Sequence, residues 1–207
     1  MERECKKKIG IMGGTFDPIH VGHLMLAEQA YDKFNLDKVL IMPAGNPPHK
    51  KNEVSALTKH RVQMTRLAIE GNKHFELSLI EVERSGYTYT YETLESLTKE
   101  NPDVEYYFIL GADSLMEVDK WKETQRIFQC ATILVATRYN LESKELNKKI
   151  KEVAKQYNGK IYLLDTPNID LSSTLIRTSV STGKSIKYYV TSDVERYIYK
   201  NKLYKHF

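Results

Sequence analysis

Two histidines stand three residues apart in a short stretch that follows an apolar run near the start of the chain. The stretch is Gly13-Gly14-Thr15-Phe16-Asp17-Pro18-Ile19-His20-Val21-Gly22-His23. Residues three apart lie on one face of a helix, and a helix N-terminus attracts anions through its free N–H groups and its dipole. Two imidazoles there would add hydrogen-bond donors for phosphate oxygens. The stretch therefore favours a phosphate-binding site, with glycines where the backbone approaches the ligand.

Two other interpretations of this stretch stay open. Zinc sites on helices favour His-Glu-x-x-His spacing with a third ligand, and here the nearest acid after the pair is Glu28. The other four histidines show no ligand spacing, so we expect no protein-bound metal. Alternatively, Asp17 caps a helix and the two histidines have no chemical role.

A second cluster of polar side chains lies near the C-terminal end, in the stretch Leu171-Ser172-Ser173-Thr174-Leu175-Ile176-Arg177. Each of the three hydroxyl residues could cap a helix, which is the plain structural interpretation. The same hydroxyls, with Arg177 within the next turn, could also bind phosphate, because the guanidinium fork suits phosphate oxygens. Together with the histidine pair, this cluster favours a polyphosphate ligand.

Apolar runs alternate with helical periodicity along the whole chain. The predicted strands are 8–12, 38–42, 75–82, 104–110, 131–136 and 161–164. Helices are predicted between them, for example where Leu24, Ala27, Tyr31 and Phe34 recur at helical spacing. This alternation predicts an α/β protein with a doubly wound parallel sheet of about five to six strands and helices on both faces. We expect a single domain over 1–207, with a C-terminal helical part, about 172–207, packed on the sheet.

In such a sheet, ligands bind beyond the carboxyl ends of the strands, where the strand order reverses. If the order is 3-2-1-4-5, the first and fourth strands are neighbours at that point. Each is followed by a glycine-containing turn that ends in an acid, at Asp17 and, in Gly111-Ala112-Asp113, at Asp113. The dehydrogenase fingerprint Gly-x-Gly-x-x-Gly does not follow the first strand. The long loop 43–59 is of a kind that is usually functional.

Composition places limits on the partners and the compartment. The net charge is +4, and the basic residues are spread along the chain, so we expect no nucleic-acid partner. No apolar run approaches the ~20 residues that a membrane span needs, and the first residues lack the apolar core of a signal peptide. The two cysteines, Cys5 and Cys130, suit free thiols. We therefore expect a cytoplasmic protein without a membrane partner.

The two phosphate-binding stretches resemble those of the (T/H)xGH nucleotidyltransferase superfamily. Within it, the chain is similar to the bacterial nicotinate-nucleotide adenylyltransferase family over nearly its whole length. The motifs that carry this closer resemblance are Pro47-Pro48-His49-Lys50, Thr88-Tyr89-Thr90-Tyr91-Glu92-Thr93-Leu94, Gly111-Ala112-Asp113, Lys120-Trp121 and Leu203-Tyr204. It departs from the family pattern at Leu171, where isoleucine is frequent, and at Thr191-Ser192, where a proline is common. The resemblance implies a Rossmann-like fold.

The resemblance also implies a reaction and a set of binding residues. ATP and nicotinate mononucleotide would react directly to give nicotinate adenine dinucleotide and pyrophosphate, with Mg²⁺ held mainly by substrate phosphates. The implied catalytic residues are His20, His23 and Arg177. The implied ATP-binding residues are Gly13, Gly14, Thr15, His20, His23, Gly111, Asp113, Ser172, Ser173 and Arg177. The implied mononucleotide-binding residues are Phe16, Asp17, Lys50, Thr90, Trp121 and Arg138. Family members often self-associate, so a homo-oligomer is compatible with the resemblance.

Plainer interpretations remain for the mononucleotide residues and for the function. Trp121 could be a core aromatic at a seam between helices, and 88–91 could be an ordinary half-buried strand or turn. A sibling transferase could use the same phosphate site with another acceptor, such as phosphopantetheine. A nucleotide-binding regulator without catalytic activity could also keep the fold. The length, the middle motifs and the full set of phosphate-binding residues favour the adenylyltransferase.

Overall fold

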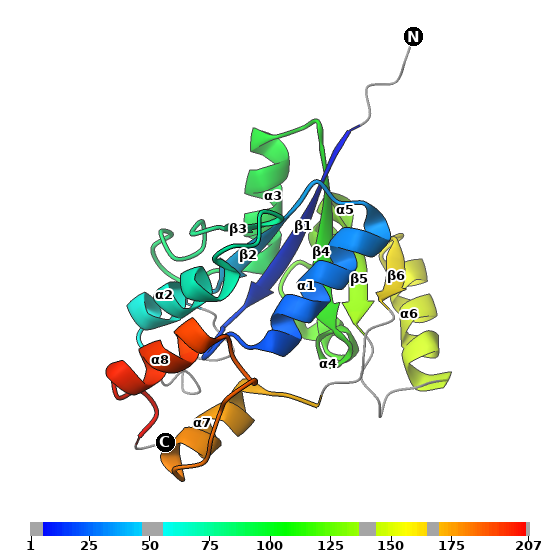
Figure 1. Cartoon of the computed structure of the whole chain (residues 1–207). Helices are drawn as coiled ribbons and strands as arrows, with labels where there is room; N and C mark the ends of the chain where they lie inside the picture. Colours follow the sequence, from blue (N-terminus) through cyan, green and yellow to red (C-terminus); the bar gives the residue numbers. More distant parts are fainter. Residues whose placement is uncertain (1–5, 47–55, 137–143, 165–169, 206–207) are drawn as a thin grey trace.

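The computed structural model describes residues 6–46, 56–136, 144–164 and 170–205, and within them six parallel strands form one sheet (Figure 1). The strands are β1 (Lys7–Gly14), β2 (Lys38–Pro43), β3 (Phe75–Leu77), β4 (Val104–Gly111), β5 (Ala131–Ala136) and β6 (Ile161–Leu164). Their order is β3-β2-β1-β4-β5-β6. The predicted α/β class and the order 3-2-1-4-5 are confirmed, and β6 extends the sheet beyond β5.

Helices connect the strands and cover both faces of the sheet (Figure 1). They are α1 (Val21–Phe34), α2 (Thr58–Ile69), α3 (Thr90–Glu100), α4 (Ala112–Met116), α5 (Thr124–Cys130), α6 (Lys144–Gln156), α7 (Ser173–Ser181) and α8 (Ser192–Lys200), with the short 3-10 helix η2 (Val118–Lys120) between α4 and α5. The predicted apolar spacing from Leu24 to Phe34 lies within α1, as expected.

Alternate strand residues divide the core into two apolar clusters, one on each face of the sheet. In β5, Leu134 belongs to one cluster, which also takes side chains from α1, α2, α7 and α8. Its neighbours Ile133 and Val135 belong to the other, with side chains from α3, α4, α5 and α6. Because α7 and α8 contribute Ile176 and Val194 to the first cluster, the C-terminal helices share the core of the α1 face.

Strand β3 is shorter than the predicted strand 75–82, which is therefore wrong beyond Leu77. The Ser78 N–H still donates to the Ile41 carbonyl at 3.0 Å, after which the chain leaves the sheet. The apolar Ile80 packs against the cluster on the α3 face instead of facing a strand partner. The backbone at Glu81 then passes close to Gly45, two residues after β2. A Cβ on Gly45 would lie 2.0 Å from the Glu81 carbonyl oxygen.

Candidate active site

The strand order reverses between β1 and β4, which pair in parallel over residues that include Ile11 and Phe108. At their carboxyl ends, β1 finishes at Gly14 and β4 finishes at Gly111, and α4 starts directly after β4. A Cβ on Gly111 would meet no atom within 4 Å, so this strand end is open. The histidine stretch therefore follows β1 and Ala112-Asp113 follows β4 where the strand order reverses, and ligand binding at this point stays a prediction.

His20 and His23 form the first turn of α1. His20 is the N-cap residue and is 5% exposed, and His23 occupies the third helical position. Their rings stack with centroids 3.6 Å apart. The His20 N–H donates to Nδ1 of His23 at 3.3 Å, so a neutral His23 carries its ring proton on Nε2. The alternative in which Asp17 caps this helix is wrong, because His20 holds the N-cap position.

The absence of a side chain at Gly22 leaves room for the His20 ring. A Cβ on Gly22 would lie 3.0 Å from the His20 Nδ1, closer than ordinary packing allows. The glycine between the two histidines therefore permits the stacked arrangement of their rings.

Asp17 is buried, with 3% of its surface exposed, and precedes Pro18 through a cis peptide bond. Its Oδ1 accepts hydrogen bonds from the Tyr204 hydroxyl at 2.7 Å and from the Ala56 N–H at 3.2 Å. Burial raises the pKa of the Tyr204 phenol, and the charge of Asp17 raises it further. The Asp17 carboxylate thus ties the loop after β1 to the last turn of the described chain, while its predicted contact with the mononucleotide stays a prediction.

The C-terminal cluster packs directly on this loop. Ser172 is the N-cap of α7 and accepts from the Leu175 N–H at 3.1 Å, as the capping interpretation expected. Ser173 Oγ donates to the Pro18 carbonyl at 2.8 Å, and Arg177 Nη1 donates to the Asp17 carbonyl at 2.9 Å. The structure therefore joins the two motifs that are far apart in the sequence, and phosphate binding by these residues remains a prediction.

Arg61 is a buried cation at the site that the sequence analysis missed. It is 1% exposed, and its Nη1 donates to the Thr15 carbonyl at 2.6 Å. Its Nη2 donates to the Gly45 carbonyl at 3.2 Å, so the guanidinium links the segments that follow β1 and β2. Burial lowers the Arg61 pKa, whereas the charge of Asp17 raises it. Its place three residues before Met64 on the buried stripe of α2 is the sequence signal that could have found it.

The segments predicted to bind the mononucleotide lie near one another on the α3 face. Trp121 is half-buried, and its ring meets Phe108 of β4 edge-on with centroids 6.4 Å apart. Lys122 Nζ lies 4.2 Å from the centroid of the Tyr89 ring, which joins this segment to the start of α3. Thr90 is the first residue of α3, and residues 88 and 89 belong to no strand, so the strand alternative for 88–91 is wrong.

Phe16 and Asp113 are two further predicted site residues that the structure describes. Phe16 is 2% exposed, has φ 51°, and packs against the His23 ring. A Cβ on Gly14 would lie 2.6 Å from the Phe16 ring, so the small residue before the turn admits that ring. Asp113 lies exposed in α4. Lys50 and Arg138 fall outside the described residues.

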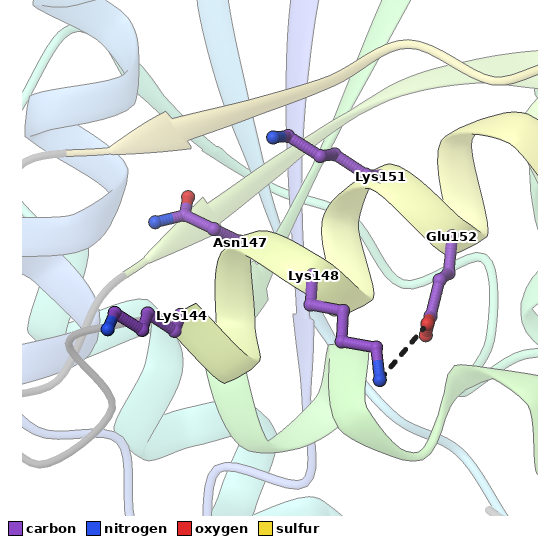
Figure 2. Close-up of a pocket in the computed structure, with 5 residues that line it drawn as sticks. All are labelled: Lys144, Asn147, Lys148, Lys151 and Glu152. Carbon is purple, nitrogen blue, oxygen red and sulfur yellow. Dashed lines mark ion pairs between the residues drawn. The ribbon is translucent and has the colours of Figure 1, made fainter.

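A separate hollow lies along α6 and contains none of the predicted site residues. Figure 2 shows its lining side chains, all from this one helix: Lys144, Asn147, Lys148, Lys151 and Glu152. Lys148 and Glu152 form an ion pair at 3.8 Å across one turn. On its other side, Lys149 of α6 pairs with Asp119 of η2, in the segment that follows β4 and α4.

Two further findings concern metals and membranes. In the parts of the chain that the structure describes, no three His, Cys, Asp or Glu side chains gather as a metal site. None of the described helices is both long enough and apolar enough to span a bilayer. Cys130 is a free thiol, and Cys5 falls outside the described residues.

Comparison with known proteins gives consistent matches. Residues 11–179 match the family model described as cytidylyltransferase-like. A protein of Thermoanaerobacter sp. (strain X514), named "Probable nicotinate-nucleotide adenylyltransferase", is 44% identical over 99% of this chain and 97% of its own length. One of the same name from Lachnoclostridium phytofermentans is 41% identical over 96% of this chain and 99% of its own length.

Solved structures share the fold at lower identity. The nicotinic acid mononucleotide adenylyltransferase of Plasmodium falciparum, complexed with NaAD, superposes with a TM-score of 0.78 at 23% identity. That match covers 97% of this chain and 98% of the other. The same enzyme complexed with APC gives a TM-score of 0.77 at 22% identity, over the same shares of both chains.

Proposed function

Because this chain belongs to the nicotinate-nucleotide adenylyltransferase family of cytidylyltransferase-like proteins, we propose that it joins ATP and nicotinate mononucleotide. The products are nicotinate adenine dinucleotide and pyrophosphate, in a step of NAD biosynthesis. One observation supports this proposal above the others: Arg177 Nη1 bonds the Asp17 carbonyl at 2.9 Å, which brings the serine–arginine cluster to the loop before His20 and His23.

The reaction needs alignment of two anions more than it needs a base. The phosphate of the mononucleotide is ionised at neutral pH and attacks the α-phosphorus of ATP. The new P–O bond forms in line with the bond to the leaving pyrophosphate, which departs with the electron pair. No proton has to be removed from the nucleophile, so catalysis consists of positioning and charge stabilisation.

The residues of the two motifs divide this work. His20 and His23 donate hydrogen bonds to the ATP phosphates, with His23 nearest the reacting centre, and the N-terminus of α1 adds its dipole. Arg177, with the hydroxyls of Ser172 and Ser173, holds the β- and γ-phosphates. A serine hydroxyl that accepts a backbone N–H, as in Ser172, still has its own proton to donate.

The residues of this site fit a Mg²⁺ ion that binds together with ATP rather than to protein side chains. The two motifs offer imidazole, hydroxyl and guanidinium groups, which suit phosphate oxygens better than a hard cation. The buried Asp17 carboxylate is engaged by Tyr204 and Ala56. Phosphate oxygens and water would therefore supply most of the ligands for Mg²⁺, which would neutralise charge on the phosphates.

The mononucleotide lies across the α3 face of the same strand ends. Trp121 stacks on the pyridine ring, and Thr90 with neighbouring backbone N–H groups binds the carboxylate at the start of α3. Asp113, in α4 at the adjoining ATP side, contacts ribose hydroxyls of ATP. Phe16, Asp17, Lys50 and Arg138 complete the proposed surroundings of the mononucleotide.

An acceptor panel tests the proposed function. The protein is incubated with Mg-ATP and with nicotinate mononucleotide, nicotinamide mononucleotide or phosphopantetheine, and the released pyrophosphate is measured. We expect fast release with nicotinate mononucleotide and much slower release with the other two. Fast release with phosphopantetheine alone would instead indicate the sibling transferase. Nucleotide binding without release in any arm would indicate a regulator.

A further inference from the structure

Glu81 lies between three chain segments near the proposed acceptor site, and the mechanism above gives it no role. Its carboxylate accepts a hydrogen bond from Thr93 Oγ1 at 3.1 Å, and Thr93 is a 2% exposed residue of α3. Arg84 Nη1 donates to the same Thr93 hydroxyl at 3.2 Å. The acid therefore bonds to the first turn of the helix that begins at Thr90.

The backbone around Glu81 is interlocked with the segment after β2. A Cβ on Gly45 would lie 2.0 Å from the Glu81 carbonyl oxygen and 3.3 Å from Thr88 Cγ2, so only glycine fits there. The Thr88 N–H donates to the Asn46 carbonyl at 3.2 Å. Three segments, at 44–46, at 78–84 and at 88–93, thus meet around one acid.

The Glu81 side chain is partly buried. Burial raises its pKa above the ordinary value, and the Thr93 hydrogen bond and the charge of Arg84 oppose that rise. Burial of a carboxyl is costly unless its oxygens are hydrogen-bonded, and here the Thr93 hydroxyl supplies such a bond.

We propose that Glu81 is a positioning residue for the acceptor: by bonding to Thr93 it fixes the segment 88–91, and so sets the affinity for the carboxylate of nicotinate mononucleotide. This inference rests on the proposed function. Glu81 acts through Thr90 and the adjoining N–H groups and does not itself touch substrate. Its effect therefore falls on the acceptor, because the ATP phosphates are held by α1 and α7.

Steady-state kinetics with paired variants test this role. We expect Glu81→Ala to raise KM for nicotinate mononucleotide about tenfold, the effect of one lost charged hydrogen bond. KM for ATP should be unchanged, and Glu81→Gln, which keeps the size and one acceptor oxygen, should restore most of the loss. Glu83→Ala, an exposed acid two residues away, is the matched control and should behave as wild type. An equal rise in both KM values, or none, would overturn the proposal.

Further measurements keep the proposal testable if Glu81→Ala does not fold. They also separate the failure of this proposal from the failure of the proposed function. Thr93→Val removes the hydroxyl from the other side at nearly constant shape, and combined with Glu81→Gln it should add no further loss in KM. Hydrogen exchange of the amides 88–93 needs no turnover, and it should be faster in Glu81→Ala and Thr93→Val than in wild type. Unchanged exchange there would contradict the role of Glu81. Failure of wild type in the acceptor panel would contradict the proposed function alone.

Discussion

Arg177 donates a hydrogen bond from Nη1 to the backbone carbonyl of Asp17, 160 residues earlier in the chain. Arg177 is 8% exposed, and its Nη2 also donates to the Thr174 hydroxyl at 3.2 Å. The bond fixes the start of α7 against the loop that leads into α1. A buried arginine thus holds together the two segments that we propose bind one triphosphate.

His23→Ala should lower kcat by about 10²–10³ while weakening ATP binding less, because the imidazole is proposed to stabilise charge that develops in the transition state. Steady-state kinetics and equilibrium ATP binding measure the two effects separately. The matched control is His74→Ala, since His74 stacks on Tyr31 beside the start of β3. A near-normal kcat in His23→Ala would show that the assigned role is wrong.

Trp121→Ala should raise KM for nicotinate mononucleotide about tenfold through loss of ring stacking, with KM for ATP nearly unchanged. Trp121→Phe keeps an aromatic face and should recover part of the loss. If KM for ATP rises instead, Trp121 contacts ATP rather than the mononucleotide. If neither changes, the ring is a core aromatic, as its edge-on contact with Phe108 would also allow.

Tyr204→Phe should lower the free energy of unfolding by about 1–3 kcal/mol, because it leaves the buried Asp17 carboxylate without one of its hydrogen bonds. Urea denaturation measures the difference. Tyr199→Phe is the control, since Tyr199 is 45% exposed and should change stability little. Equal stabilities of Tyr204→Phe and wild type would mean that the 2.7 Å bond contributes nothing net.

The link between Asp119 and Lys149 should make stability depend on acid pH. The hydrogen bond from Lys149 lowers the Asp119 pKa below its ordinary value of 3.8, and the Tyr157 hydroxyl adds to this. Because the folded pKa is lowered, the stabilisation is present above the unfolded pKa and is lost as the pH falls through the folded value.

Asp119→Asn should therefore cost about 0.5–1 kcal/mol at neutral pH, a small amount because the pair is partly exposed. The difference in free energy of unfolding between Asp119→Asn and wild type, measured by denaturant titration, should shrink toward acid pH. Glu152→Gln removes the more exposed Lys148 pair of α6 and should have a smaller effect. If this difference in stability stays constant down to acid pH, the lost stability comes from packing rather than from charge.

Local patterns in the sequence predicted the elements that carry the phosphate-binding motifs. The three-residue spacing of His20 and His23 places both in the first turn of a helix, and the structure has them at its N-cap and third positions. The structure also has the strand order 3-2-1-4-5, on which the expected place of the site was conditional. The alternation of strands and helices predicted the α/β class. Predictions of this kind succeed because they depend on periodicity within one segment.

Residues that depend on distant backbone could not be predicted in the same way. Besides the Thr58 hydroxyl of its own helix, Arg61 bonds to the carbonyls of Thr15 and Gly45, and no local pattern in α2 identifies those two carbonyls. The Ile80 and Val82 side chains suggested a longer third strand, yet hydrophobicity does not distinguish a strand from a loop that packs on a core. Glu81 was missed for the same reason, because its role comes from three segments that meet only in the fold.

The most direct test of the account uses ATP that carries a chiral thiophosphate at the α position. The protein is given this nucleotide, Mg²⁺ and nicotinate mononucleotide, and the configuration at phosphorus in the dinucleotide product is determined. We predict that the thio-dinucleotide forms with inversion, as expected of a single in-line attack by the mononucleotide phosphate. Product with retained configuration would show a covalent enzyme intermediate, and either that result or a lack of any dinucleotide would contradict the account.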